Sequence, residues 1–194
     1  VQHAVSCSRL LFQLYQLMLG IISKIFGVSK SEKDVKLILP MVEKTNRFFA
    51  EYQSLSNDQL RHKTVEFKTR IKEYLAQADE EIALKNKGAE DLPVADINGR
   101  DTIYKEVDAL KKGRDKKIEE ILKELLPEAF AVVKETSRRF KENEVLVVTA
   151  TELDRELATR QDHISIIGQE AHYKNTWTAG GGSVTWNMVH YDVQ

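Results

Sequence analysis

Apolar residues recur at helical spacing through the first two thirds of the chain. From residue 38 onward they alternate steps of four and three, which places one face of a helix on Ile38, Val42, Thr45, Phe49 and Tyr52. Pro40 lies inside this pattern, so we expect the helix to start or to kink there.

A second helix is predicted to begin at residue 56. Ser56 as N-cap and Gln59 three residues later form a capping box, and Leu55 and Leu60 flank it as a hydrophobic staple. The residues that follow carry an apolar arc and a charged face, on which Glu66 and Arg70 are spaced as an ion pair. We interpret that charged face as solvated.

Glycines and prolines divide the next stretch. Lys87 and Gly88 predict the end of the second helix, and residues 88–100 are predicted to form a loop. Helical spacing resumes at Asp101, and Pro127 suits the first turn of a further helix, with Phe130, Val133 and Phe140 on one face.

The pattern changes after Asn143. Residues 145–148 and 164–167 are short β-branched runs, and residues 151–160 allow one or two helical turns between them. Residues 173–178 and 184–186 flank a glycine-rich hairpin loop at 179–183. The fold class is therefore mainly α, with long amphipathic helices and a small β-hairpin region near the C-terminus.

Residues 10–26 form the most apolar stretch of the chain. Polar residues interrupt it along one narrow stripe, which indicates an amphipathic helix with a broad apolar face rather than a membrane span. Packing on a core or partner is the first interpretation, contact with a membrane surface the second and a secretion signal the last. The chain begins with Val1, and Met18 suits a translation start, so we expect residues 1–17 to be an upstream extension.

Composition narrows the function only slightly. Charged residues make up 30% of the chain and its formal net charge is −1, so the basic excess of a nucleic-acid-binding protein is missing. Cys7 is the single cysteine, and the five histidines have no metal-ligand spacing, so no metal site is predicted.

Four blocks resemble the SecA family of preprotein translocase ATPases. Residues 18–27 (MLGIISKIFG) resemble its amphipathic N-terminus, and residues 54–71 (SLSNDQLRHKTVEFKTRI) resemble its LSDEELRxKTxEF helix. Residues 125–139 (LLPEAFAVVKETSRR) resemble its LLPEAFAVV helix, and residues 187–194 (NMVHYDVQ) resemble its MRHFDVQ glutamine motif. The four blocks follow the family's order. Val189 replaces the arginine of the glutamine motif.

The resemblance implies a domain plan. Residues 18–143 are expected to form an N-terminal helical region, and residues 144–194 an inserted β-containing segment. That segment leads into the truncated start of an α/β P-loop-type nucleotide-binding domain. Two stretches, residues 77–117 and 140–186, exceed the family pattern and are interpreted as insertions of a kind associated with Bacteroidetes.

The glutamine motif supplies the candidate site. A glutamine amide can donate to N7 and accept from N6–H of adenine, a pairing that guanine cannot satisfy, so Gln194 is predicted to select ATP. Tyr191 or Met188 would supply an apolar surface for the base. The glycines at 180–182 have no following lysine, so they cannot form a phosphate-binding loop, and no catalytic residue or Mg²⁺ ligand is predicted in this chain.

The resemblance implies the N-terminal part of an ATP-driven motor that moves preproteins through the Sec translocon. Its expected partners are the translocon channel, preproteins and an anionic phospholipid surface, with no nucleic acid, and the parent protein could be a homodimer. Its expected location is the cytoplasm, peripherally at the inner face of the plasma membrane. Two alternatives are a non-enzymatic helical adaptor at a membrane surface and, disfavoured by the near-neutral charge, an RNA helicase fragment.

Overall fold

The computed structural model describes residues 30–192, with side chains from residue 34 onward. Two compact units divide the chain between Glu43 and Lys44. Helix α2 (Lys30–Tyr52) crosses this boundary and contains Pro40, so the helix begins ten residues before the proline instead of at it. In the first unit, the side chains of Val35, Leu37 and Ile38 are at least half exposed. The predicted amphipathic stretch at 10–26 lies outside the described residues.

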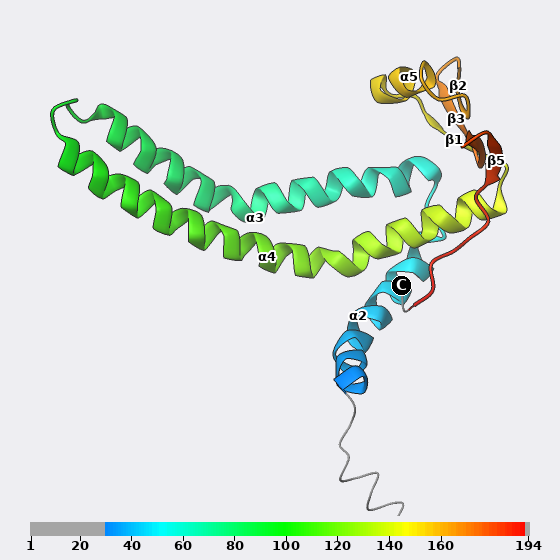
Figure 1. The fold of residues 1–194 in the computed structure, drawn as a ribbon, viewed down its shortest axis with the longest axis horizontal. Coiled ribbons are helices and arrows are strands. Elements are labelled where there is room, and N and C mark those ends of the chain that lie inside the picture. Colours follow the sequence, from blue (N-terminus) through cyan, green and yellow to red (C-terminus); the bar gives the residue numbers. More distant parts are fainter. Residues whose placement is uncertain (1–29, 193–194) are drawn as a thin grey trace, which may run out of the picture. The chain divides into compact units, whose positions relative to one another are not determined.

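Two long antiparallel helices dominate the second unit (Figure 1). Helix α3 (Asn57–Asp91) and helix α4 (Ile97–Glu142) are joined by a short connection at residues 92–96. Side-chain pairs cross the hairpin along its length, and partners step back along α4 as they step forward along α3: Arg70 with Glu124 and Glu128, Tyr74 with Glu120, Asp79 with Arg114, and Lys85 with Glu106.

The helix ends differ from the prediction at two glycines and one proline. Gly88 and Gly99 both lie inside helices, and neither has the positive φ that a glycine helix cap adopts. Helix α3 ends instead before Pro93, because the residue preceding a proline avoids the helical region, and Leu92 is extended. Pro127 lies in the middle of α4 rather than at a helix start.

The capping box at Ser56 is confirmed. The Ser56 hydroxyl accepts a hydrogen bond from Gln59 N at 3.2 Å, and Gln59 Oε1 accepts one from Ser56 N at 2.8 Å. Leu55 and Leu60 share one apolar cluster with Tyr52 and Ala131, to which Phe48 and Phe49 add their rings. This cluster joins the end of α2, the start of α3 and the last third of α4, so it is the core of the hairpin's base.

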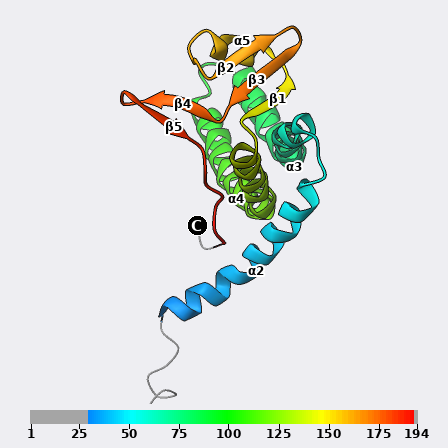
Figure 2. The ribbon, with the colours of Figure 1, turned by 90° about the vertical axis from the view of Figure 1, so that its right-hand side faces the viewer.

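A small β region follows α4 (Figure 2). Strands β1 (Val145–Thr149) and β2 (Ile164–Ile167) flank β3 (Glu170–Lys174) in an antiparallel sheet, with helix α5 (Glu152–Ala158) between β1 and β2. Strands β4 (Thr176–Ala179) and β5 (Gly182–Thr185) form a separate hairpin that turns at Gly180 and Gly181, both with positive φ. The mainly helical class with a β region near the C-terminus is therefore confirmed. Within the described residues, no helix is long and apolar enough to span a membrane.

Candidate functional site

A buried arginine joins the base of the hairpin. Arg139 Nη2 donates to the carbonyl oxygens of Tyr52 and Leu55, at 3.0 and 2.7 Å, and Nη1 donates to Asn57 Oδ1 at 2.8 Å. Its Nε donates to Glu135, whose side chain is fully buried. Burial alone would raise the pKa of Glu135, but hydrogen bonds from Arg138 and Arg139 outweigh it and lower the pKa. The turn between α2 and α3 is therefore fixed to the end of α4.

The β region is fixed to α3 by a second buried charge. The fully buried carboxylate of Asp154 accepts hydrogen bonds from Arg61 at 2.8 Å, from the backbone and hydroxyl of Thr151, and from the Tyr173 hydroxyl. One turn earlier on α3, Asp58 accepts two hydrogen bonds from Thr149 at 2.8 Å each. Arg61 belongs to the charged face of α3 that was interpreted as solvated, and for this residue the interpretation is wrong, because its guanidinium group binds Asp154 and its side chain is only 35% exposed.

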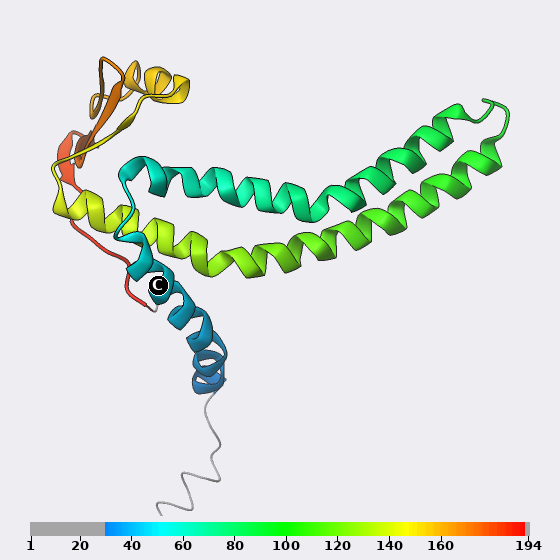
Figure 3. The ribbon, with the colours of Figure 1, turned by 180° about the vertical axis from the view of Figure 1, so that it is seen from behind.

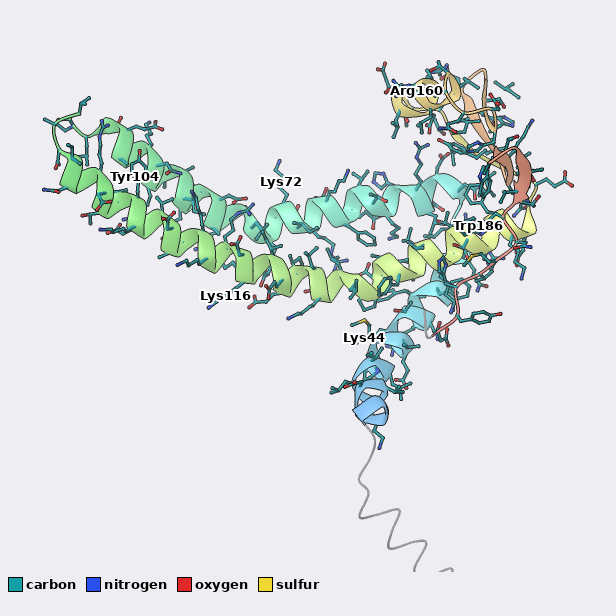
Figure 4. All side chains as sticks on the ribbon, in the orientation of Figure 1. Lys44, Lys72, Tyr104, Lys116, Arg160 and Trp186 are labelled. Atoms are coloured by element: carbon teal, nitrogen blue, oxygen red, sulfur yellow. The ribbon has the colours of Figure 1, made fainter. Side chains whose placement is uncertain are left out.

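The chain returns from the β region along α4 (Figure 3). Trp186 lies beside the C-terminal end of α4, and its indole nitrogen donates to Ser137 O at 3.2 Å and to Met188 O at 3.0 Å (Figure 4). His190 Nδ1 lies 3.2 Å from the Ser137 hydroxyl. Residues 186–190 are therefore held against one turn of α4.

Asp192 makes the last described anchor of this segment. Lys134 Nζ donates to Asp192 Oδ1 at 2.6 Å, and Asn46 Nδ2 donates to Oδ2 at 2.9 Å. Lys134 also donates to Asn46 Oδ1 at 2.9 Å, so each pair of the three residues is bonded. The hydrogen bonds from Lys134 and then Asn46 lower the pKa of Asp192. We call these three residues the Asp192 clamp.

Two of the predicted adenine contacts lie within the anchored stretch. Met188 is 39% exposed and Tyr191 is 75% exposed, while the side chains of His190 and Asp192 bind Ser137 and Lys134 of α4. Met188 and Tyr191 are therefore accessible at the surface of this segment. Gln194 lies outside the described residues.

Two open apolar grooves flank the same turns of α4. One, of about 290 Å³, lies between α3, α4 and β1 and includes Leu60, Val132 and Leu146 in its lining. The other, of about 320 Å³, lies between α4 and the β region and includes Phe140, Trp177 and Trp186. Across residues 34–192, no three His, Cys, Asp or Glu side chains gather where they could hold a metal ion.

The clamp was not found from the sequence. Asp192 lies within the quoted glutamine motif and Lys134 within the LLPEAFAVV block, but no spacing rule links two residues 58 positions apart. A signal existed for the buried network, because Ala131, Glu135 and Arg139 follow one another at steps of four. Two charged residues on the same helical stripe as an alanine indicate a buried ion pair only when the partner helix that covers this stripe is known.

Comparison with known proteins defines the class of this chain. Residues 22–194 match the family model described as the SecA DEAD-like domain, which places the chain in the class of DEAD-like domains. A protein translocase subunit SecA from Parabacteroides distasonis is 45% identical over 172 residues, and one from Flavobacterium psychrophilum is 44% identical over 173. One from Porphyromonas gingivalis is 42% identical over 172 residues. No solved structure matches the chain.

The chain belongs to the SecA family. These alignments cover 89% of this chain but 15% of each relative, so the chain spans about a seventh of the length of the relatives that it matches. The unmatched tenth of the chain is shorter than either residues 77–117 or residues 140–186. These relatives therefore share at least part of both predicted insertions, and they belong to the Bacteroidetes as the resemblance indicated.

Proposed function

We propose that this chain is the N-terminal part of an ATP-driven subunit that moves preproteins through the Sec translocon. The family membership and the relatives' shared name support this function over a non-enzymatic adaptor. On this proposal residues 18–143 form the helical region, and residues 144–194 form the inserted β segment that leads into the start of a P-loop-type nucleotide-binding domain.

One observation carries the nucleotide part of the proposal. The segment that ends in the glutamine motif is held to α4 at Trp186, His190 and Asp192, while Met188 and Tyr191 stay exposed. A segment that is fixed on one side and exposes apolar side chains on the other suits the stacking of an adenine base. Such a preorganised surface loses little conformational entropy when the base binds.

In this proposal, residues 1–194 do not supply the groups that bind the phosphates of ATP. ATP hydrolysis needs backbone amides and a lysine that hold the phosphates, together with Mg²⁺ ligands, and the sequence contains no GxxxxGK[ST] loop. Residues 34–192 also bring no acidic cluster together for Mg²⁺. Residues 1–194 alone would therefore bind ATP weakly and not hydrolyse it.

The proposal includes partners and a location. The translocon channel and unfolded preproteins would be the protein partners, and the apolar face at 10–26 would contact an anionic phospholipid surface with help from Lys24. The protein would then be cytoplasmic and peripheral at the inner face of the plasma membrane, and it could act as a homodimer.

Substitution of Gln194 tests the proposal in a chain extended to the length of its relatives. Gln194→Ala removes both amide contacts to adenine, so ATP affinity should fall by about 1–3 kcal/mol while GTP affinity changes little. The measurement is the ratio of ATP to GTP affinity by calorimetric titration. If Gln194→Ala weakens both nucleotides equally, Gln194 only orders its loop and the assignment is wrong.

A further inference from the structure

We propose that the Asp192 clamp is a positioning device that couples recognition of the adenine base at Gln194 to the packing of helices α2 and α4. This inference rests on the proposed function, because it names residues that would place the adenine-reading glutamine. None of the three clamp residues would touch the nucleotide.

The clamp fixes Asp192 from two helices at once. One carboxylate oxygen accepts from Lys134 on α4 and the other accepts from Asn46 on α2, so both oxygens are held. Lys134 is itself constrained, because it also donates to Asn46 and lies 5.0 Å from the centre of the Phe49 ring. Its side chain is 14% exposed, which reduces the screening of its charge by water. The position of Asp192 therefore reports how α2 and α4 pack together.

The remaining contacts limit where the segment can move. Trp186 and His190 both bind Ser137, which lies three residues after Lys134, within the next turn of α4. Residues 186–192 thus follow the surface of α4 and cannot shift along it without breaking several hydrogen bonds. Asp192 is two residues from Gln194, a reach of about 7 Å at full extension, so the position of Asp192 limits where the glutamine can lie.

The helices that hold the clamp are also those that the buried arginine holds. Arg139 binds the carbonyl oxygens of Tyr52 and Leu55, and Tyr52 and Phe49 lie on the same helix as Asn46. A change in the packing of α2 on α4 would therefore reach Asp192 through Asn46 and Lys134. By reciprocity, a nucleotide that holds Gln194 in place would stabilise the packed arrangement of the two helices.

Lys134→Met tests the inference in the chain extended to the length of its relatives. Methionine keeps an unbranched side chain of similar length but removes the charged donor to Asp192 and Asn46 that also lies over the Phe49 ring. We expect ATP affinity to fall about two- to fivefold, as for a partly exposed ion pair, and GTP affinity to change less. Lys134→Arg, which keeps the charge, should restore most of the ATP affinity. Lys105→Met is the matched control, because Lys105 pairs with Asp101 on the exposed surface of α4 and should change neither affinity.

A double-mutant cycle separates positioning from a general structural role. If the clamp acts through the glutamine, Lys134→Met should cause no further loss of ATP affinity once Gln194 is alanine. Amide hydrogen exchange of residues 187–192 should rise in Lys134→Met and in Asp192→Asn, but not in Lys105→Met. These two clamp variants provide independent checks if one of them unfolds.

The outcomes distinguish the two proposals. If Gln194→Ala leaves the ratio of ATP to GTP affinity unchanged, the proposed adenine contact is wrong and the coupling falls with it. If Gln194→Ala lowers the ratio but Lys134→Met does not, the function stands and the coupling is wrong. Equal losses of ATP and GTP affinity in Lys134→Met would likewise overturn it, since a structural defect does not discriminate between bases.

Discussion

Two carboxylates in this chain stay charged although both are fully buried. Glu135 and Asp154 have no exposed side-chain surface, and burial alone would raise the pKa of each. For Glu135 the hydrogen bonds from Arg138 and Arg139 outweigh burial. For Asp154 the hydrogen bonds from Arg61, Tyr173 and Thr151 together outweigh burial, and the pKa of Asp154 falls well below its ordinary value. Burial, and then the hydrogen bond that the Tyr173 hydroxyl donates to Asp154, raise the pKa of Tyr173 to about 12. Each carboxylate therefore fixes one joint, between α2, α3 and α4 or between α3 and the β region.

The lowered pKa of Asp154 predicts a loss of stability in acid. Because the folded pKa lies below the unfolded one, Asp154 contributes stability that is full above about pH 4 and is lost as the pH falls toward the folded value. Asp154→Asn should cost about 1–3 kcal/mol at pH 7, since it leaves Arg61 without its charged acceptor. It should also flatten the fall in unfolding free energy between pH 5 and pH 3, measured by urea denaturation at each pH.

The matched control for this experiment is Asp101→Asn. Asp101 pairs with Lys105 on an exposed face, with 62% of its side chain accessible, so its substitution should change little. An acid transition in Asp154→Asn as steep as in the parent would show that Asp154 does not govern it.

At the scale of elements, the features that neighbouring residues determine could be predicted from the sequence. The points at which the two long helices begin and end could not. The capping box at Ser56 and strands at 145–148 and 164–167 were predicted, and the structure has the box and strands at 145–149 and 164–167, because these features depend on neighbouring residues alone. The predicted loop at 88–100 was wrong over most of its length. Long-range contacts decide such cases, since Lys85 with Glu106 ties the two helices together beside Gly88. The pair predicted between Glu66 and Arg70 was wrong for the same reason, because Arg70 binds Glu124 and Glu128 on α4.

Two glycines inside α4 should respond oppositely to alanine. At Gly113 an added Cβ meets nothing within 4 Å, so Gly113→Ala should stabilise the chain by about 0.5–1 kcal/mol through helix propensity. At Gly99 the Cβ would lie 2.4 Å from Asp96 Oδ2, the carboxylate that caps α4 by accepting from Gly99 N. Gly99→Ala gains the same propensity but displaces the cap, which is worth about 1 kcal/mol, so it should be neutral or destabilising.

Urea midpoints of the two alanine variants measure this difference. Repeating Gly99→Ala in an Asp96→Ala background isolates the cap, because the substitution should then stabilise the chain as it does at Gly113. If Gly99→Ala still destabilises the chain without the Asp96 carboxylate, the conflict lies somewhere other than the cap.

At the scale of the whole second unit, separate blocks of sequence meet at one place. The block at 54–71 meets the block at 125–139 through Arg139 and Asn57, and the motif at 187–194 meets that same block through Lys134 and Asp192. The resemblance predicted which blocks matter, but their contacts follow only from the folded hairpin. The Asp192 clamp joins residues 46, 134 and 192, a separation that no pattern within a helix or strand reveals.

Each predicted insertion begins and ends at nearly the same point of the hairpin. For residues 77–117, Asp79 and Arg114 face each other across the two helices and form an ion pair. For residues 140–186, Asn175 binds the carbonyl oxygen of Phe140 at 3.1 Å, and Trp186 binds Ser137. A segment whose two ends lie side by side can be lengthened or removed without separating the elements to which its ends are attached. The base of the hairpin therefore does not depend geometrically on its distal part.

Shortening the hairpin in register should leave its base intact. Deleting residues 80–113 and joining the helices by a short glycine-rich turn keeps Asp79 opposite Arg114, and it keeps the pairs of Arg70 and Tyr74 with α4. We expect the truncated chain to unfold cooperatively, with low hydrogen exchange at residues 134–139 and 186–192 as in the parent. The reason is that each turn of α3 contacts only the facing turns of α4. Removing the distal turns therefore removes only the stability that those turns contribute.

A deletion of the same length out of register provides the control. Removing residues 73–106 takes away Tyr74 and Asp79 but keeps Arg114 and Glu120, so one helix overhangs the other and exposes the apolar stripe around Val107, which is 1% exposed in the parent. This variant should lose cooperativity or self-associate, as shown by urea denaturation and sedimentation. If the two deletions behave alike, the register of the cross-hairpin pairs does not determine stability. If the in-register deletion alone raises hydrogen exchange at residues 186–192, the distal hairpin supports the Asp192 clamp, and the base is not independent of it.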